Sequence, residues 1–457
     1  ALSVSRIRSG PVDRPRLVAL VGVLTAIQLA LFAWYLNANI IRHLYWDMYS
    51  WVLHYLDYRA QGGWWAYVWG SHDVHRPVFI RLLTAFDIEA FSGASYPFIV
   101  FTTACHVATG WLLWRECQAG VHGGFGRALG RLVLMLVFTS VAAVACAVPL
   151  NNGYLHVLTC AVLAIVLFDG ADDDGRAGRR WVHWRRAGAV LAAIAAPFAS
   201  AVGWAVWPIL FWIAWRGRAG RAWIAAIAAV ATAFVLVYLQ GLSIGQAAGS
   251  SPARALDSLG SLLGRLNYLI TYLGLPWTRA AALTVPGRVC GAVLLGAGVW
   301  AVLARGVLRA PSGRLERIGL ALIMFSLGTA LLAAIGRVEV APDDGVLVPV
   351  RYSSLVAPLY IGLLWVVSPA LQRLWNDAGR SRIVATGVVG ACVLLLALQV
   401  ASGQAAAAIT SRMRATIEQF EAGQTTPEMS DVVFSDVEQA RREWEIIRSA
   451  GLYLNVK

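Results

Sequence analysis

Apolar runs about 20 residues long recur along the whole 457-residue chain. A helix of about 20 residues is long enough to cross the hydrocarbon core of a bilayer. Hydrophobic residues make up 58% of the chain and charged residues only 14%, against about half and a quarter in soluble domains. The sequence therefore predicts an all-α polytopic membrane protein and excludes a soluble nucleic-acid binder. The eleven predicted spans, of which the two around Pro197 are short, are 17–36, 96–114, 129–150, 154–168, 187–198, 201–215, 222–239, 289–303, 318–335, 353–367 and 383–401.

Basic residues are distributed unevenly between the segments that connect these spans. With a cytoplasmic N-terminus, the cytoplasmic segments hold 22 of the 38 basic residues and 8 of the 25 acidic ones, which leaves 16 basic and 17 acidic residues elsewhere. Arginine and lysine favour the cytoplasmic side of a membrane protein. The net charge of +13 is therefore interpreted as an orientation signal, and the N-terminus is predicted to be cytoplasmic.

Three extracytoplasmic segments are predicted to be long: 37–95, 240–287 and 402–457. The second contains an amphipathic stretch over 256–275, and the third is polar and helical in pattern. We expect a transmembrane domain over 1–401 and an extracytoplasmic helical tail over 402–457. The chain has no glycine-rich phosphate-binding motif, so a cytoplasmic nucleotide-driven engine is not predicted.

The first long segment begins with a predicted interfacial helix. The residues that would share one face of it, at spacings of four, four and three, are His43, Asp47, Trp51 and His54. Asp47 follows the first span by about ten residues, near the expected membrane surface, where a carboxylate can act as a general base towards an acceptor hydroxyl. The alternative is an interfacial carboxylate that faces water or pairs with Arg42.

A second polar cluster comprises His72, Asp73, His75 and Arg76. It follows the aromatic run 64–69 and precedes an amphipathic stretch over 78–91. A guanidinium group matches phosphate oxygens, and both histidines can hydrogen-bond to a phosphate. The aromatic run either stacks on a sugar ring or forms an interfacial belt. The His-Asp-x-His spacing does not specify a metal site, so no cofactor is predicted and a divalent metal is left as an alternative.

Two arginines lie at the predicted outer edge of the membrane, against the general charge trend. Arg337 ends one span, and Arg351, followed by Tyr352, begins the next. Charges at a membrane edge are candidates for functional residues. The alternative is that they snorkel, or pair with Asp343, Asp344 or Glu339.

Together these features resemble the GT-C superfamily of membrane glycosyltransferases, which use sugars carried on polyprenyl phosphates. The stretch 75–83, His-Arg-Pro-Val-Phe-Ile-Arg-Leu-Leu, is similar to an Asn-Glu-His-Arg-x-x-x-x-Arg-Leu-Leu element of uncharacterised bacterial members. Gly336-Arg337 and Arg351-Tyr352 resemble their penultimate loop. The chain departs from the pattern at Val74, where glutamate is expected, and at Asp47, which lacks the second adjacent acid of many relatives.

The resemblance implies inverting transfer of a sugar from a polyprenyl-phosphate donor to a glycan or glycolipid acceptor, outside the bacterial cytoplasmic membrane. It implies Asp47 as catalytic base, although the departures leave the choice between Asp47 and Asp73 open. It also implies arginines that hold the donor phosphate, for which the matches are Arg76, Arg337 and Arg351. The further substrate-binding candidates are His54, His72, His75 and Tyr352.

Two other functions fit the same spans. A transporter or flippase of polysaccharide lipids would also cross the membrane many times, but it would be expected to have internal repeats or charges at the midplane, which the sequence lacks. A membrane acyltransferase would need a catalytic histidine within the bilayer, and His106 is the candidate.

Overall fold

The computed structural model describes residues 14–72, 75–176, 181–217, 219–242, 259–274, 284–337, 350–377, 379–426, 428–434 and 436–453. All regular structure in these ranges is helical, apart from an isolated bridge between His72 and His75. The prediction of an all-α polytopic membrane protein is confirmed at this level. Eight helical stretches in the described ranges are long and apolar enough to cross a bilayer, or nine if one bent pair counts as a span.

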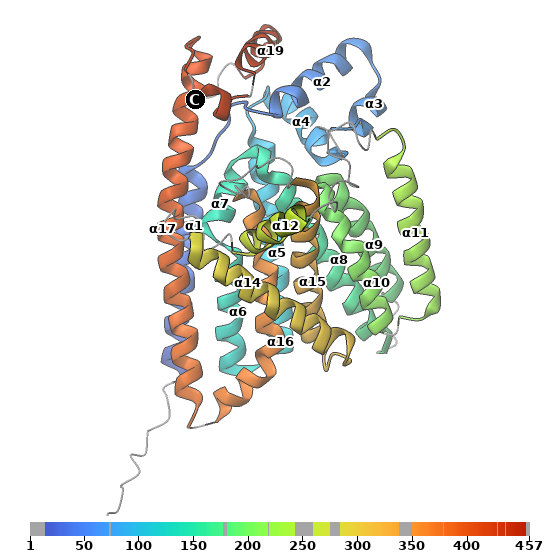
Figure 1. Ribbon diagram of the computed structural model, residues 1–457, viewed down its shortest axis with the longest axis vertical. Coiled ribbons are helices and arrows are strands. Elements are labelled where there is room, and N and C mark those ends of the chain that lie inside the picture. The colour runs from blue at the N-terminus through green and yellow to red at the C-terminus, as the bar shows by residue number, and fades with distance from the viewer. Residues whose placement is uncertain are drawn as a thin grey trace, which may run out of the picture.

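The long elements form an elongated bundle (Figure 1). Its helices are α1 (Arg14–Ala38), α5 (Tyr96–Gly120), α6 (Gly123–Val137), α7 (Ser140–Ala147), α8 (Asn152–Arg176), α9 (Val182–Ala199), α10 (Val206–Arg216), α11 (Arg221–Leu239), α14 (Thr284–Ala301), α15 (Arg314–Arg337), α16 (Ala357–Asn376) and α17 (Ser381–Glu421). Shorter turns precede or extend them: η1 (Pro149–Asn151), η2 (Ala201–Ala205), η5 (Val302–Val307) and η7 (Val350–Leu355).

The remaining helices are short, and most of them gather at one end of the bundle (Figure 1). They are α2 (Met48–Gln61), α3 (Trp64–Trp69), α4 (Val78–Phe91), α12 (Leu259–Leu273), α18 (Met429–Val432) and α19 (Val437–Ser449). The amphipathic stretches expected at 78–91 and 256–275 correspond to α4 and α12. We refer to α2, α3, α4, α18 and α19 as the outer cap.

The span predicted over 129–150 is broken rather than continuous. α6 and α7 meet at a 45° bend, where Thr139 has an extended backbone and its hydroxyl accepts a hydrogen bond from the Ala142 amide. Gln399 accepts two further hydrogen bonds from Ser140, one from its amide and one from its hydroxyl. A break inside a membrane is tolerated where such partners satisfy the freed backbone groups.

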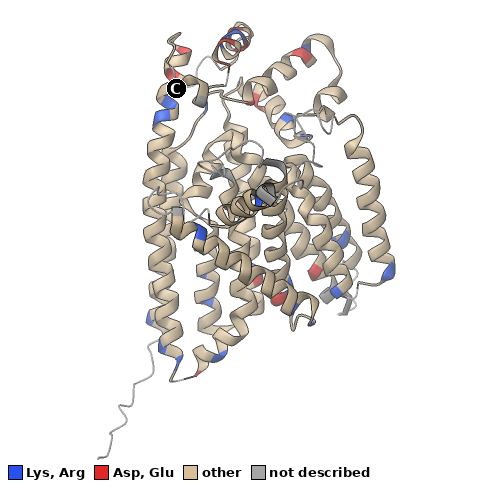
Figure 2. Ribbon diagram, viewed as in Figure 1, with Lys and Arg blue, Asp and Glu red and all other residues tan. Residues whose placement is uncertain are grey.

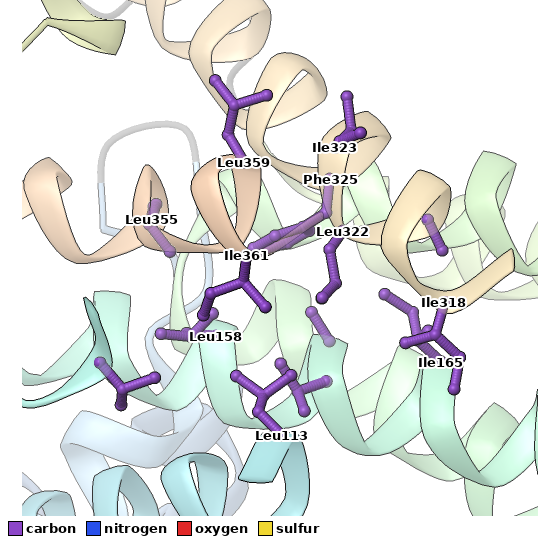
Figure 3. Packing of buried hydrophobic residues seen from close by; sticks show 14 of the residues in the cluster. Leu113, Leu158, Ile165, Ile318, Leu322, Ile323, Phe325, Leu355, Leu359 and Ile361 are labelled. Atoms are coloured by element: carbon purple, nitrogen blue, oxygen red, sulfur yellow. The ribbon is translucent and has the colours of Figure 1, made fainter. Parts of the chain in front are cut away.

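The main core lies where α5, α8, α15 and α16 pack together (Figure 3). Its side chains are almost fully buried, and they include Leu113, Leu158, Ile165, Ile318, Leu322, Ile323, Phe325 and Ile361. Gly319 and Gly362 allow α15 and α16 to approach closely, since a Cβ on Gly362 would lie 2.3 Å from the Gly319 carbonyl oxygen. Small residues at helix contacts are typical of membrane bundles, where packing replaces the hydrophobic driving force.

The domain boundary expected at 402 falls inside a continuous helix. α17 runs for 41 residues, and Ser402 is buried within it. At this end of the bundle, Phe420 of α17 joins Tyr49 and Trp444 of the outer cap in a second hydrophobic cluster. The expected tail is helical, but it packs on residues 41–55 instead of forming a separate unit.

Buried ion pairs join helices at the opposite end of the bundle, where many of the arginines lie (Figure 2). Arg317 on α15 reaches both carboxylate oxygens of Asp169 on α8, at 2.6 and 3.3 Å. Arg314 lies 2.9 Å from Glu116 on α5 and 3.7 Å from Asp169. Because these charges neutralise one another in a buried position, they bind three helices together.

Candidate functional site

Asp47 lies at the start of α2, in the outer cap. The single helix predicted to contain both His43 and Asp47 is wrong, because α2 begins only at Met48. Trp46 has a positive φ of 49°, which breaks the helix, and its amide donates to the Val433 carbonyl at 2.6 Å. His43 instead lies 3.0 Å from Glu421 at the end of α17. Residues far along the chain therefore set the direction in which α2 starts.

The structure brings Asp47 and His72 together. His72 Nε2 lies 3.5 Å from Asp47 Oδ2, and the Asp47 side chain is 45% exposed against 17% for His72. Two backbone hydrogen bonds of 2.8 and 3.1 Å join His72 to His75, and their rings lie 5.8 Å apart. An accessible carboxylate with an imidazole beside it can accept a proton from a hydroxyl group. Asp73, the alternative base, lies outside the described residues.

Arg76 has a different environment from the one predicted. Its side chain is buried, and it donates to the carbonyl oxygens of Trp69, Tyr238 and Gln240. The Tyr238 and Gln240 carbonyls belong to the end of α11, which has no further helical donors for them. Arg76 thus attaches the outer cap to α11, and we do not assign it to a phosphate.

Arg81 lies in the stretch 75–83, and the sequence pattern predicted no function for it. It is buried on α4 and donates to the carbonyl oxygens of Tyr67 and Ser71. It lines a pocket of about 280 Å³ between α2, α3 and α4. The sequence does hold a signal for this role, because Arg81 falls within the amphipathic stretch 78–91. An arginine that becomes buried when such a helix packs needs polar partners.

His54 also lines this pocket, on α2 two turns beyond Asp47. Partial burial lowers the pKa of His54, and the positive charge of Arg81 lowers it further. Its imidazole is therefore neutral at pH 7 and can both donate and accept a hydrogen bond. His54 and His72 belong to the same region of the outer cap, since His72 also contributes to lowering the pKa of His54.

A groove on the side of the bundle is almost entirely apolar. It has a volume of about 430 Å³ and lies between α6, α14, α16 and α17. Val367 and Leu394 in its walls are 41% and 51% exposed, so the groove opens on the surface that faces lipid. Apolar chains of lipids are the ligands that such a surface suits.

A small pocket of about 50 Å³ adjoins this groove, and the two share Leu136, Tyr360 and Leu395. Most of its lining is apolar, and we call it the polar pocket because it also contains polar side chains, which the groove lacks apart from Tyr360. Its polar residues come from the α6–α7 break, η7 and α17: Thr139, Ser353, Ser354, Gln399 and Ser402. The pocket lies at the level of the last turn of α1, because Gly403, next to the lining residue Ser402, packs on the ring of Tyr35. The groove and the pocket therefore form one continuous depression that is apolar along the groove and has polar side chains at the pocket.

The other predicted substrate residues lie in or beside α15 and η7. Tyr352, in η7, is buried against Tyr154 and Tyr272, with ring centroids 4.7 and 5.4 Å away. Arg337 ends α15 and Arg351 lies in η7, but their side chains lie outside the described residues. Arg265 donates to the carbonyls of Ala334 and Ile335, which end α15, so it stabilises that helix end.

In the part of the chain that the structure describes, no three His, Cys, Asp or Glu residues gather where they could hold a metal ion.

His106 is 1% exposed, stacks on Phe32 and donates from Nε2 to the Val137 carbonyl at 3.1 Å. The region around Asp47 therefore remains the candidate site. No protein-family model, curated protein or solved structure matches this chain.

Proposed function

We propose that the protein is a glycosyltransferase that uses a sugar donor carried on a polyprenyl phosphate. The observation that carries this proposal is the apolar groove between α6, α14, α16 and α17, which adjoins the polar pocket at the level of the last turn of α1. A polyprenyl chain would occupy the groove, and its phosphate would lie at the polar pocket. No nucleotide-binding motif is needed, because the donor sugar arrives already attached to lipid.

Asp47 is the proposed general base. It takes the proton from an acceptor hydroxyl as that oxygen bonds to the anomeric carbon of the donor. The bond from this carbon to the phosphate oxygen breaks at the same time, so the configuration inverts and the polyprenyl phosphate leaves with the electron pair. His72, whose Nε2 lies 3.5 Å from Asp47 Oδ2, is the proposed electrostatic neighbour that stabilises the carboxylate. Arg351, two residues before Ser353 in the polar pocket, is the proposed partner of the phosphate.

The topology is part of the same proposal. Adding α9 and α10 to the nine spans that pass by length and composition gives eleven crossings. An odd number of crossings with a cytoplasmic N-terminus puts the outer cap and the C-terminal helices outside the bacterial cytoplasmic membrane. The many arginines at the opposite end of the bundle support this orientation (Figure 2).

The two rival functions have less support. A flippase must carry a polar headgroup across the bilayer, whereas the groove has only apolar lining residues and Tyr360. An acyltransferase needs an accessible histidine, whereas His106 is enclosed by Phe32 and Phe138. A glycan or glycolipid acceptor is proposed on the basis of the aromatic residues of the outer cap, which can stack on sugar rings.

The test is a transfer assay with the full chain in lipid nanodiscs. Polyprenyl phosphates carrying labelled sugars are offered with an envelope extract as acceptor, and product is measured for the wild type, Asp47→Asn and the matched carboxylate control Glu445→Gln. We expect transfer by the wild type and the control, and its loss in Asp47→Asn. No transfer from any lipid-linked sugar would reject the proposal, and movement of intact donor between leaflets would favour the flippase.

A further inference from the structure

Two arginine side chains are buried close to each other in the first loop, and neither pairs with a carboxylate among the described residues. Arg76 and Arg81 are each only 3% exposed. All the hydrogen bonds that their side chains make in the described structure go to backbone carbonyls. Carbonyl oxygens satisfy N–H donors but do not cancel a charge, and a buried charge is costly unless an opposite charge pairs with it. This part of the outer cap is therefore suited to an anion.

Only Arg81 of these two lines the pocket between α2, α3 and α4. Its Nε is buried and makes no hydrogen bond to any of the described residues. Gly70 makes room for the guanidinium, since a Cβ there would lie 2.4 Å from Arg81 Nη1. The pocket thus has a buried cation in its wall.

The other walls suit a sugar ring. Tyr58 and Tyr67 line the pocket and lie nearly parallel, with ring centroids 5.8 Å apart. Trp64 does not line the pocket but packs behind Tyr58, with ring centroids 5.2 Å apart. Aromatic faces carry negative charge density, so they attract the C–H groups on the face of a sugar. The pocket volume of about 280 Å³ is at the lower limit for small-molecule sites, which matches a single ring.

Polar side chains around the pocket can bind sugar hydroxyl groups. His54, Asp57 and Gln61 lie on successive turns of α2 and all line the pocket. Together they offer donors and acceptors on one side of the ring, while Arg81 offers a charge on another.

The pocket adjoins the proposed base. Ser71 lines the pocket and accepts a hydrogen bond from Arg81, and the next residue, His72, lies 3.5 Å from Asp47. We propose that this pocket is the acceptor subsite and that it binds a sugar ring bearing an anionic group, a carboxylate or a phosphate, through Arg81. The assignment to the acceptor rests on the proposed glycosyltransferase function, but the binding itself does not.

Binding can be measured without any transfer. Saturation-transfer difference NMR on the full chain in nanodiscs would compare glucuronate, glucose 6-phosphate and glucose. We expect glucuronate or glucose 6-phosphate, or both, to bind at least tenfold more tightly than glucose. Comparing glucuronate with glucose 6-phosphate then shows whether the pocket prefers a carboxylate or a phosphate. Equal binding of all three sugars, or of none, would overturn the inference.

Three variants locate the binding. Ala66→Trp fills the pocket without removing a hydrogen bond, and Ala60→Trp adds the same side chain to an exposed position of α2 that does not line the pocket. We expect the first to abolish binding of the anionic sugar and the second to leave it unchanged. Arg81→Gln should lower the affinity for the anionic sugar to the affinity for glucose. Thermal unfolding of this variant verifies that it is folded.

The exposed carboxylate of Asp57 gives a test of the charge itself. Asp57→Asn removes a negative charge from the pocket, so it should tighten binding of the anionic sugar several-fold and leave glucose unchanged or weaker. Weaker binding of both sugars would contradict anion recognition. If anionic sugars bind as expected but no lipid-linked donor is consumed, the subsite stands and the glycosyltransferase proposal fails.

Discussion

His72 Nε2 lies 3.5 Å from Asp47 Oδ2, although 25 positions of the chain separate the two residues. The backbone just before Asp47 is held by the hydrogen bond from the Trp46 amide to the Val433 carbonyl, and the backbone of His72 is held by its pairing with His75. The pair is thus fixed from two sides, while the Asp47 side chain stays accessible to a substrate.

Asp47→Asn should reduce sugar transfer by about 10²- to 10⁴-fold, the usual contribution of a general base. The amide keeps the shape of the side chain but cannot accept the acceptor's proton. Donor binding, measured separately, should change little. A variant that retains full transfer would exclude Asp47 as the base and leave Asp73 as the remaining candidate.

His72→Gln should reduce transfer less than Asp47→Asn, because His72 acts on the substrate only through the carboxylate. Its effect should also depend on pH, since an imidazole changes charge near neutrality and an amide does not. The measurement is the pH profile of transfer for the wild type and the variant. Two profiles of the same shape would indicate that His72 has a purely structural role.

Leu136→Trp should block both the apolar groove and the polar pocket, since Leu136 lines both. We expect a higher KM for the lipid-linked donor, or loss of its binding. Overpacking should lower the free energy of unfolding by no more than about 1–3 kcal/mol. Leu236→Trp, at a lipid-facing position of α11, is the matched control. Equal donor binding in both variants would place the lipid elsewhere.

Asp87 should make the stability of the outer cap depend on pH. Burial raises its pKa from 3.8 to about 6, although the Ser95 amide and the Tyr453 hydroxyl both donate to it. A raised pKa in the folded state means that the stabilisation is complete below about pH 4 and is lost as the pH rises through about 6. The size of the change is about 3 kcal/mol at most.

Asp87→Asn stays neutral at every pH and should remove that dependence. The measurement is thermal unfolding in detergent between pH 4.5 and 8, roughly spanning the titration. We expect the variant to gain stability relative to the wild type as the pH rises. If the difference between the two proteins does not change with pH, Asp87 is not buried as described.

Asp169→Asn should destabilise the bundle by about 3–5 kcal/mol, the cost of removing one partner from a buried ion pair. The change leaves Arg317 buried without its carboxylate. The unfolding midpoint in detergent checks this, with the exposed Glu438→Gln as the control. A loss no larger than that of the control would mean that the Arg317 charge finds water or another partner.

The sequence alone determined that this chain folds as membrane-crossing helices, and it located α4 and α12 closely. Both results depend on the hydrophobicity and spacing of neighbouring residues, which can be read within a short window. The distribution of arginines between the connecting segments is likewise a local property, so it supports an orientation without knowledge of contacts.

Only the tertiary structure decided which polar groups meet. Residues from the end of the chain stop a helix from starting before Met48, and Gln399 completes the break at Ser140, 259 positions away. Arg76 and Arg81 look alike in sequence, yet one is attached to α11 and the other lines a pocket. A buried polar group needs a specific partner, and the fold supplies that partner from parts of the chain that no local pattern connects.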